Sequence, residues 1–516
     1  MKSFPIMTYA VQSAGPVLSG LMLDNGPALL AAYLQDNGYS PRIFDYNNVE
    51  TYRQIAVKGK RAFLERTVEE LDYEIKSTGA KVLGSKLYAN GFKDNAWILQ
   101  QLRLRNPKLI VVGGGPQVAW FGPELFKYND VFDALVYGNG DDAIVSIARA
   151  VYDGGTLADA NGMLLKDGRK NRIFVSDLKD LPMPIYDPEV YIGLNGKMMI
   201  PVVEDSRSCY MRCSFCLHWL VGGPVRVRPI EEVAREMEHY KSKEMGVSRL
   251  AGANPKPEYV NDLVARLSPE TRISAFGYSN PGYDFKNLSG KIIALFIGVE
   301  STDPEVLRRY RKTTNPERYL RHAKEMIQGC REAGIATIVS MIIPSPFDTD
   351  ASIDKNAEWV LDANPDFATA LPLGLFFGTE LMKQAEQEEE CGIRLHTGFK
   401  KKFMDFEMDN LRPPTEQPTI PYDMVINGKM TNSIFSATGR FVTAMAKHGI
   451  FPLSDEIALM AYLYHKGLSN DQDERRKQCI DFHEKGRKMI VQGDHEGLDS
   501  MVRRINKCQS EIARGI

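Results

Sequence analysis

The sequence predicts an α/β protein with a doubly wound, Rossmann-like N-terminal sheet, a partial (β/α)6 TIM-like barrel after it, and a helical C-terminal domain. Three observations support this prediction. Short apolar runs alternate with amphipathic stretches over residues 1–155 and again over residues 196–383, and the alternation is lost from residue 384 onward. A chain of 516 residues is also too long for a single hydrophobic core.

The first alternating block, residues 1–155, predicts one parallel sheet covered by helices on both faces. Sheets of this kind bind ligands beyond the carboxyl ends of their strands. The strands are expected at residues 4–10, 42–46, 81–87, 109–112 and 134–137, and the helices at residues 26–37, 67–77, 95–105 and 142–151.

A connector, residues 156–195, separates the two blocks. Residues 163–175 predict a hairpin with Asp167 and Gly168 at its turn. Residues 177–187 contain two prolines and are expected to be extended, because proline restricts the residue before it.

The second block, residues 196–383, predicts six strand–helix units, which suits an open, incomplete barrel. Such barrels place their chemistry at the carboxyl ends of the strands. The strands are expected at residues 200–204, 248–252, 272–277, 292–300, 335–343 and 367–375, and the helices at residues 229–241, 258–267, 317–333 and 352–361.

The last segment, residues 384–516, is predicted to be helical. Residues 433–447, 455–466 and 471–491 follow helical patterns and are rich in Arg, Lys and Glu, without the strand alternation of the earlier blocks.

Composition restricts the class of partner. The chain has 64 Lys and Arg against 66 Asp and Glu, and this near balance gives no electrostatic case for nucleic acid or membrane binding. The N-terminus lacks the apolar region of a signal peptide, and no run of 18 apolar residues follows. We therefore expect a cytoplasmic protein whose scattered thiols are reduced.

Cys209, Cys213 and Cys216 form the most informative pattern, since the chain has only seven cysteines. Their C-x3-C-x2-C spacing suits a metal centre, because clustered thiolates bind iron–sulfur clusters or zinc. Three thiolates can hold three irons of a 4Fe–4S cluster and leave the fourth iron open to another ligand. Zinc with His218 as a fourth ligand is the main alternative, and unligated cysteines are the second. The loop follows the first barrel strand, which favours the cluster.

With this spacing, and with the aromatic Phe215 directly before the last cysteine, residues 196–383 resemble the radical S-adenosylmethionine (SAM) superfamily. The resemblance implies that the amino and carboxylate groups of SAM bind the open iron. It also implies that one electron cleaves SAM to methionine and a 5′-deoxyadenosyl radical, with Phe215 packed beside the adenine. Ordinary core packing is the alternative role of Phe215.

Further residues of the second block match the same superfamily. Residues 297–301 resemble the segment whose glutamate contacts SAM, so the resemblance assigns that contact to Glu300, with Lys312 in the same segment. A salt bridge with a neighbouring Arg or Lys is the alternative for Glu300. Ser340 resembles a contact to the SAM ribose. Residues 249–254 lack the Gly-Gly-Glu run of many relatives, which leaves the methionine amino group without an assigned partner.

The first block carries a separate glycine-rich pattern at the end of its fourth strand. Glycines let a flat ligand or a phosphate approach the backbone closely. The spacing is not G-x-G-x-x-G, so a dinucleotide site is not favoured, and a bare strand-end turn is the alternative. The residues of this pattern are Gly113, Gly114, Gly115, Pro116 and Gln117.

The same region resembles the cobalamin-binding domain of cobalamin-dependent radical SAM enzymes. Ser85 and Leu87 match the Ser-x-Leu element of these domains, and the glycines above match their Gly-Gly element. Residues 137–141, including Gly138, resemble their Gly-Glu-Gly-Glu segment, with Asn and Asp in place of the glutamates.

One usual feature of cobalamin domains is missing. A histidine commonly ligates the cobalt from below, but the first histidine of this chain is His218. The resemblance therefore implies a cobalt without a histidine ligand, with water or a residue of the loop 9–26 beneath it.

Together the resemblances imply a cobalamin-dependent radical SAM methyltransferase with a 4Fe–4S cluster, SAM and cobalamin as cofactors. The implied reaction methylates an unactivated carbon of a small molecule or natural-product intermediate, through methylcobalamin and a 5′-deoxyadenosyl radical. An external electron donor similar to flavodoxin or ferredoxin would reduce the cluster. The C-terminal helices would close the site and select the substrate.

Two other functions stay open. A non-methylating enzyme of the same family would use the same cofactors for ring rearrangement or oxidative cyclisation. A zinc-stabilised cobalamin-binding protein without turnover is the second alternative, and its metal content would distinguish it from the enzymes.

Overall fold

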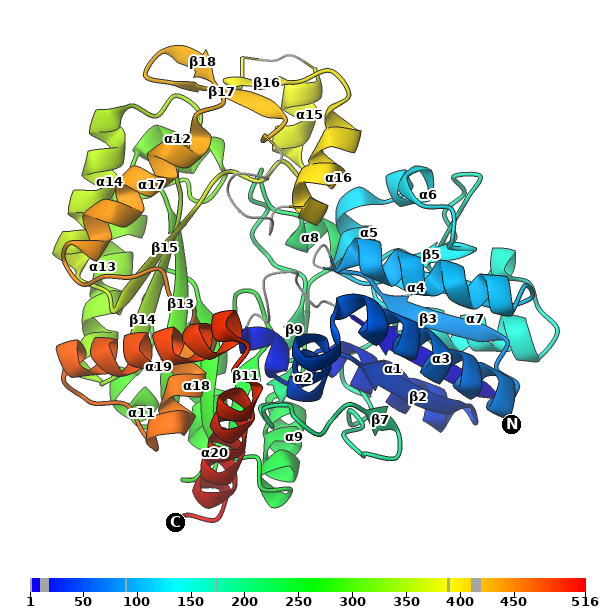
Figure 1. The fold of residues 1–516 in the computed structure, drawn as a ribbon. Helices are drawn as coiled ribbons and strands as arrows, with labels where there is room; N and C mark the ends of the chain where they lie inside the picture. Colours follow the sequence, from blue (N-terminus) through cyan, green and yellow to red (C-terminus); the bar gives the residue numbers. More distant parts are fainter. Residues whose placement is uncertain (1, 10–17, 89–90, 173–174, 388–389, 410–418) are drawn as a thin grey trace.

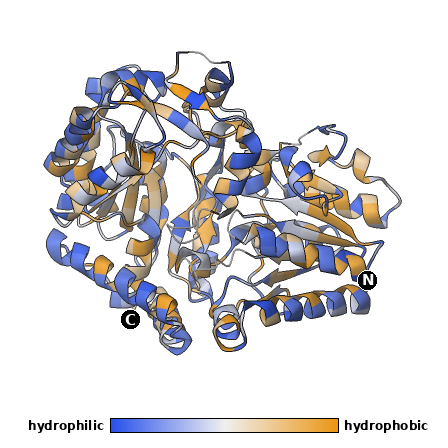
Figure 2. Ribbon diagram, turned by 45° about the horizontal axis from the view of Figure 1, so that its top comes forward, coloured by the Kyte–Doolittle hydropathy of each residue, from blue (hydrophilic) through white to orange (hydrophobic). Residues whose placement is uncertain are grey.

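The structure, a computed structural model of the chain, describes residues 2–9, 18–88, 91–172, 175–387, 390–409 and 419–516. Two parallel sheets lie side by side, one from the N-terminal part and one from the middle of the chain (Figure 1). Apolar residues gather on the strands, and the outward helix faces are largely hydrophilic (Figure 2). Residues 10–17, in the loop expected beneath the cobalt, lie outside the described residues.

The N-terminal sheet has the predicted doubly wound arrangement, with the strand order β6-β5-β4-β3-β1-β2-β7. Its neighbouring strands are parallel except for the pair β5 and β6. One apolar cluster joins the sheet to α3 and α4, and a separate one joins it to α1 and α7, because successive strand side chains point to opposite faces. The strands are β1 (Ser3–Thr8), β2 (Ser40–Asp45), β3 (Val82–Lys86), β4 (Ile110–Gly114), β5 (Ala134–Val136), β6 (Met163–Leu165) and β7 (Tyr191–Ile192).

The helices of this part include three that the sequence pattern did not predict, α2, α5 and α6. Helix α2 buries only Val49 and Thr51, so its apolar periodicity is weak. Helices α5 and α6 are six and five residues long, too short to show a period. The helical segments are η1 (Leu18–Leu21), α1 (Asn25–Asp36), α2 (Val49–Lys58), α3 (Lys60–Thr78), α4 (Phe92–Arg105), α5 (Pro116–Phe121), α6 (Glu124–Tyr128), α7 (Asp141–Tyr152) and η2 (Leu157–Asp159).

Residues 156–195 contribute strands to both edges of the N-terminal sheet. The expected hairpin forms, since Leu164 of β6 bridges Lys170 antiparallel across the turn. Strand β6 pairs with β5 at one edge, and β7 pairs with β2 at the other. The stretch at residues 181–187 has no regular secondary structure and runs between these edges.

The second sheet is the predicted six-stranded open barrel. Its strand order, β15-β14-β13-β12-β11-β8, follows the chain, and the paired strands are parallel. The strands are β8 (Val202–Val203), β11 (Val247–Leu250), β12 (Arg272–Gly277), β13 (Ile292–Glu300), β14 (Ala336–Ile342) and β15 (Phe367–Leu371). The helices are α8 (His218–Val221), α9 (Ile230–Ser242), α10 (Pro257–Arg266), α11 (Phe285–Leu288), α12 (Pro304–Arg309), α13 (Pro316–Glu332) and α14 (Asp350–Ala363).

The chain after residue 383 is mainly helical, as predicted, and also contains a small antiparallel sheet at the top of Figure 1. Two of its three strands have only three residues, too few for an alternating pattern to stand out in the sequence. The elements are α15 (Glu380–Glu386), β16 (Ile393–Leu395), α16 (Phe399–Asp409), β17 (Tyr422–Ile426), β18 (Lys429–Thr431), α17 (Ile434–Ala446), α18 (Asp455–His465), α19 (Gln472–Gln492) and α20 (His495–Ala513).

Helix α18 fills the barrel at the amino ends of its strands. It packs against β12, β13 and β14, and its cluster contains Ala294 and Ala336 near the starts of two of them. Arg249 of β11 donates a hydrogen bond of 2.8 Å to Asp455 in the first turn of α18. Helix α18 therefore closes this end of the barrel. Separately, no described helix of the chain is long and apolar enough to cross a membrane.

A buried ion pair attaches α19 to the barrel. The Arg475 guanidinium donates to the Asp366 carboxylate at 2.8 Å, and both side chains are fully buried. Asp366 also accepts a hydrogen bond from the backbone of Thr337 on β14. A buried charge that loses its partner is strongly destabilising.

We therefore expect Asp366→Ala to lower the free energy of unfolding by about 3–5 kcal/mol, because it leaves the buried Arg475 charge uncompensated. Chemical denaturation measures this change. The control is Asp362→Ala, which removes a largely exposed carboxylate from α14 and should cost less than about 1 kcal/mol. Equal effects of the two substitutions would contradict the assigned role of the buried pair.

Candidate functional site

The cysteine loop leaves the barrel through a short antiparallel ladder. Strands β9 (Ser206–Arg207) and β10 (Arg226–Val227) pair at its base. The Ser208 hydroxyl then donates to the Gly223 carbonyl at 2.8 Å. At the far side of the loop, Ser214 accepts from the backbone N–H of Leu381 and donates its own N–H to the Tyr310 carbonyl. The loop is thus held from both ends at the carboxyl side of the barrel.

The three cysteines of this loop have surroundings that suit iron ligation. The backbone N–H of Met211 donates to Cys209 Sγ, and that of His218 donates to Cys216 Sγ, each at 3.4 Å. Such hydrogen bonds stabilise thiolates and tune iron–sulfur clusters. Burial raises the pKa of Cys213 to about 11, although Lys312 opposes the rise. A cationic cluster would offset this cost by binding the thiolates.

The arrangement of the described side chains favours neither the zinc alternative nor the cluster. Among the residues that the structure describes, no three Cys, His, Asp or Glu side chains already form a metal-binding group. Burial lowers the pKa of His218, and a hydrogen bond to the backbone of Ser208 opposes this shift. The fit of the cysteines to a cluster therefore rests on their donor chemistry and on the N–H groups directed at their sulfurs.

Glu300 ends strand β13 in a left-handed conformation, with φ of 71°. The register shifts between Gly298 and Glu300, which turns the carboxylate into the mouth of the barrel. Lys312 donates to Glu300 Oε1 at 2.9 Å, and both side chains are 11% exposed. A side chain at position 298 would clash, since its Cβ would lie 2.5 Å from that same oxygen. The alternative expected for Glu300, a salt bridge, is therefore present.

A cavity of about 660 Å³ lies at the carboxyl ends of β13, β14 and β15. It brings together Phe215, Glu300 and Ser340, the three residues assigned to SAM from sequence. Phe215 also packs edge-on against Tyr310, with ring centroids 5.1 Å apart. Other lining residues were not predicted. They come from β14, the end of β15 and the chain after it, α16 and α17: Met341, Ile342, Leu371, Pro372, Leu373, Gly374, Phe376, Phe406, Glu407 and Phe435.

Glu407 is the one charged residue among the described lining residues that sequence reasoning missed. Burial raises the pKa of its carboxyl to about 7. The only signal in the sequence was an acidic residue within the aromatic helix that also carries Phe399, Phe403 and Phe406. Such a glutamate is usually a solvated surface residue, so the pattern alone did not single it out.

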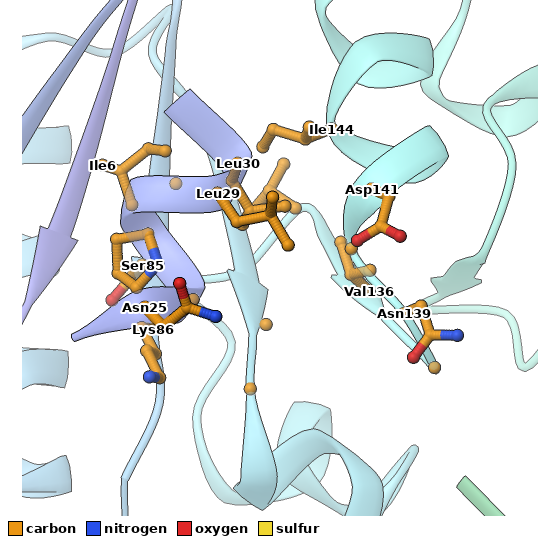
Figure 3. Close-up of a pocket in the computed structure, with 18 of the residues that line it drawn as sticks. Ile6, Asn25, Leu29, Leu30, Ser85, Lys86, Val136, Asn139, Asp141 and Ile144 are labelled. Atoms are coloured by element: carbon orange, nitrogen blue, oxygen red, sulfur yellow. The ribbon is translucent and has the colours of Figure 1, made fainter. Parts of the chain in front are cut away.

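A second cavity of about 290 Å³ lies at the carboxyl ends of the N-terminal strands, between α1 and α7. Figure 3 shows side chains of α1, including Leu29 and Leu30, together with Val136, Asp141 and Ile144 around it. The lining includes five residues of the predicted cobalamin set: Ser85, Gly113, Gly114, Gly115 and Gly138. Leu87, Pro116 and Gln117 are not among its lining residues.

The glycines of this turn serve different purposes. At Gly113 a Cβ would lie 2.8 Å from the side chains of Leu87 and Leu135, so this glycine is required by packing behind the strand. At Gly114 the nearest atom to an added Cβ is Val136 Cβ at 3.7 Å, which leaves room beside the backbone. Gly115 has φ of 99°, which favours glycine. The turn therefore fits a ligand laid against Gly114, while Gly113 is glycine because Leu87 and Leu135 pack against it.

Charged residues line the same cavity. Lys86 donates to both oxygens of Asp24, at 2.6 and 2.8 Å. Burial alone would raise the pKa of Asp24, but Lys86 outweighs it and the pKa is lowered. Arg207 of β9 donates to Asp141 of α7 and to Glu204. Arg207 therefore belongs to this cavity and also to the strand that leads into the cysteine loop.

Comparisons with known proteins agree with this geometry. Residues 203–360 match the sequence model of the Radical SAM superfamily, so the barrel is a radical SAM domain, which implies a 4Fe–4S cluster and SAM. The anaerobic magnesium-protoporphyrin IX monomethyl ester cyclase of Rubrivivax gelatinosus is 23% identical over 454 residues, 83% of this chain and 75% of that protein. The cobalamin-dependent radical SAM methyltransferase TokK of Streptomyces tokunonensis is 22% identical over 347 residues, 61% of this chain and 49% of that protein.

A solved structure extends the similarity to the whole fold. The radical SAM methyltransferase TsrM from Kitasatospora setae, with cobalamin and a 4Fe–4S cluster bound, matches 94% of this chain and 99% of its own. The TM-score is 0.68 at 15% identity, so the two proteins share a fold. The resemblance to cobalamin-dependent radical SAM enzymes, expected from the sequence, is thus confirmed.

The Glu300–Lys312 pair gives a test of this site. We expect Glu300→Gln to lower the free energy of unfolding by about 3 kcal/mol, because it leaves the buried Lys312 ammonium without its carboxylate. Adding Lys312→Met should recover most of that loss, and a double-mutant cycle in urea measures the coupling. The control, Glu305→Gln in an exposed pair of α12, should change stability by less than about 0.5 kcal/mol. A cycle with no coupling would show that the two groups act independently.

Proposed function

We propose that the protein is a cobalamin-dependent radical SAM methyltransferase that methylates an unactivated carbon of a small molecule. The observation that carries this proposal is the junction at Arg207. This residue lines the glycine-turn cavity and lies two residues before Cys209, so the two predicted cofactor sites adjoin one strand. A reaction that combines both cofactors needs them side by side.

The residues have separate tasks in this proposal. Cys209, Cys213 and Cys216 would hold three irons of the cluster, and Glu300 and Ser340 would orient SAM in the larger cavity. When bound, the cluster would supply an electron for SAM cleavage and cobalamin would supply the methyl group. The apolar walls of the cavity, including Phe215, would exclude water from the radical.

The remaining assignments follow from the same proposal. We divide the chain into a cobalamin-binding domain (1–155), a connector (156–195), a radical SAM core (196–383) and a substrate-selecting segment (384–516). The glycine-turn cavity would hold cobalamin, with no histidine of residues 1–155 below the cobalt, since that part of the sequence contains none. A one-electron donor similar to flavodoxin or ferredoxin would reduce the cluster.

A non-methylating reaction is the second candidate. The cyclase relative, matched over 83% of this chain, supports it. Products of SAM separate the two candidates. Methylation predicts S-adenosylhomocysteine and 5′-deoxyadenosine in about equal amounts, together with a methylated product, because one SAM supplies the methyl group and another the radical. A non-methylating enzyme gives 5′-deoxyadenosine alone.

The test uses the full chain, purified without oxygen and supplied with iron, sulfide and cobalamin. Mass spectrometry would follow SAM-derived products over a library of metabolites. We expect both nucleoside products, and their absence in every reaction would contradict the proposed function. Bound zinc, without iron and without absorption near about 400 nm, would instead favour the zinc-stabilised binding protein.

Replacing one cluster ligand gives a sharper prediction. We expect Cys213→Ala to abolish the absorption near about 400 nm and the formation of 5′-deoxyadenosine, while cobalamin binding persists. Absorption spectra and product analysis measure both. The control is Cys391→Ala, another buried cysteine, which should leave both properties unchanged. Loss of cobalamin binding along with the cluster in Cys213→Ala would contradict the proposed separation of the two cofactor domains.

A further inference from the structure

Glu407 lies on α16 and lines the cavity that holds the predicted SAM contacts, but nothing above assigns it a role. Helix α16 is anchored by aromatic contacts one turn and two turns before Glu407. Phe403 stacks on Phe399 with ring centroids 5.3 Å apart, and it contacts Phe121 of α5 at 6.2 Å. These contacts hold the helix between the barrel and the N-terminal sheet, so the position of Glu407 is set by packing.

The carboxylate of Glu407 is the one charge of the cavity without a partner among the described residues. Only Glu300 and Glu407 are charged among the described lining residues, and Glu300 is paired with Lys312. No hydrogen bond or ion pair joins Glu407 to any described residue, and burial is the whole cause of its raised pKa. An isolated carboxylate in apolar surroundings is costly, and a cationic ligand would remove that cost.

The rings around this carboxylate suit the same kind of ligand. Phe215, Phe376, Phe406 and Phe435 line the cavity, and phenyl faces attract cations through their quadrupole. Phe435 is 48% exposed and Leu371 is 63% exposed, so apolar surface at this cavity remains open to a ligand. A cavity of about 660 Å³ has room for SAM and a small second molecule.

We propose that Glu407 binds the ammonium group of the substrate, so that the substrate is a small amine with an apolar or aromatic body. This inference rests on the proposed function, since it takes the cavity as the place where the substrate meets SAM. The carboxylate supplies the counter-charge and the phenyl rings enclose the apolar body. Glu300 and Ser340 come from barrel strands, whereas Glu407 and Phe435 come from α16 and α17, so the substrate side of the cavity belongs to the C-terminal segment.

Two pairs of probes test the inference on the anaerobically reconstituted full chain. Each pair matches an amine with its alcohol: phenethylamine with 2-phenylethanol, and hexylamine with hexanol. Calorimetry with SAM present should show at least one amine binding tenfold or more tighter than its alcohol. Glu407→Gln should abolish this preference, because the amide keeps the shape and loses the charge. The control Asp405→Asn, on the same helix and outside the lining of the cavity, should retain it.

The outcomes separate the inference from the proposed function. If neither amine binds more tightly than its alcohol to the wild type, the inference is wrong, and this result does not depend on how a variant folds. If Glu407→Gln weakens SAM binding and leaves the amine preference, the carboxylate serves SAM and the inference is again wrong. If wild type shows the Glu407-dependent amine preference but forms no 5′-deoxyadenosine with any substrate, the proposed function fails while the amine subsite stands.

Discussion

The buried guanidinium of Arg207 joins the N-terminal part of the chain to the barrel. It donates to Asp141 of α7, to Glu204 and to Ser176, so residues of the N-terminal sheet, the connector and the barrel share one cation. A buried charge is tolerated only where it is fully paired, which gives this junction one favourable arrangement. Because Cys209 follows two residues later, the same pairing sets where the cysteine loop begins.

The larger cavity lies at the open end of the barrel. Apolar packing fills the amino ends of the strands, and at their carboxyl ends it connects the barrel to α5 and α16. Helix α18 occupies the amino ends of the strands, and its buried side chains pack against them. At the carboxyl ends, an aromatic cluster that includes Trp120, Phe376 and Phe403 connects the barrel to α5 and α16. The elements that surround the cavity are thereby held together by aromatic contacts at its wall, through Phe376. Among the described residues Glu407 has no partner, and aromatic packing holds its helix in place.

Much of the fold could be predicted because buried parallel strands are apolar over their whole length. The strands at residues 272–277 and 292–300 were predicted with the bounds that the structure has. Prediction was weaker where an element buries little. Helix α2 has two buried residues, and β8 has two residues where five were expected, because the chain turns there toward the cysteine loop. Helix α20 lies in the segment predicted to be helical but was not placed individually, although it buries seven residues and Gln509 bonds it to the backbone of Val247.

The candidate site also has a part that the sequence predicts and a part that it does not. The sequence by itself determined which chemical groups are available: three clustered thiols, a glutamate and a serine at strand ends, and a glycine turn without a nearby histidine. These follow from residue identity and from the rule that parallel strands bring their carboxyl ends to one edge. Only the tertiary structure decided which groups share a cavity. It separated Leu87, Pro116 and Gln117 from the glycine-turn cavity. It also brought Glu407 into the same cavity as Phe215, more than 180 residues away in the chain. The physical reason is that strand alternation and helix packing choose the direction of each side chain, and these depend on contacts between segments that are distant in sequence.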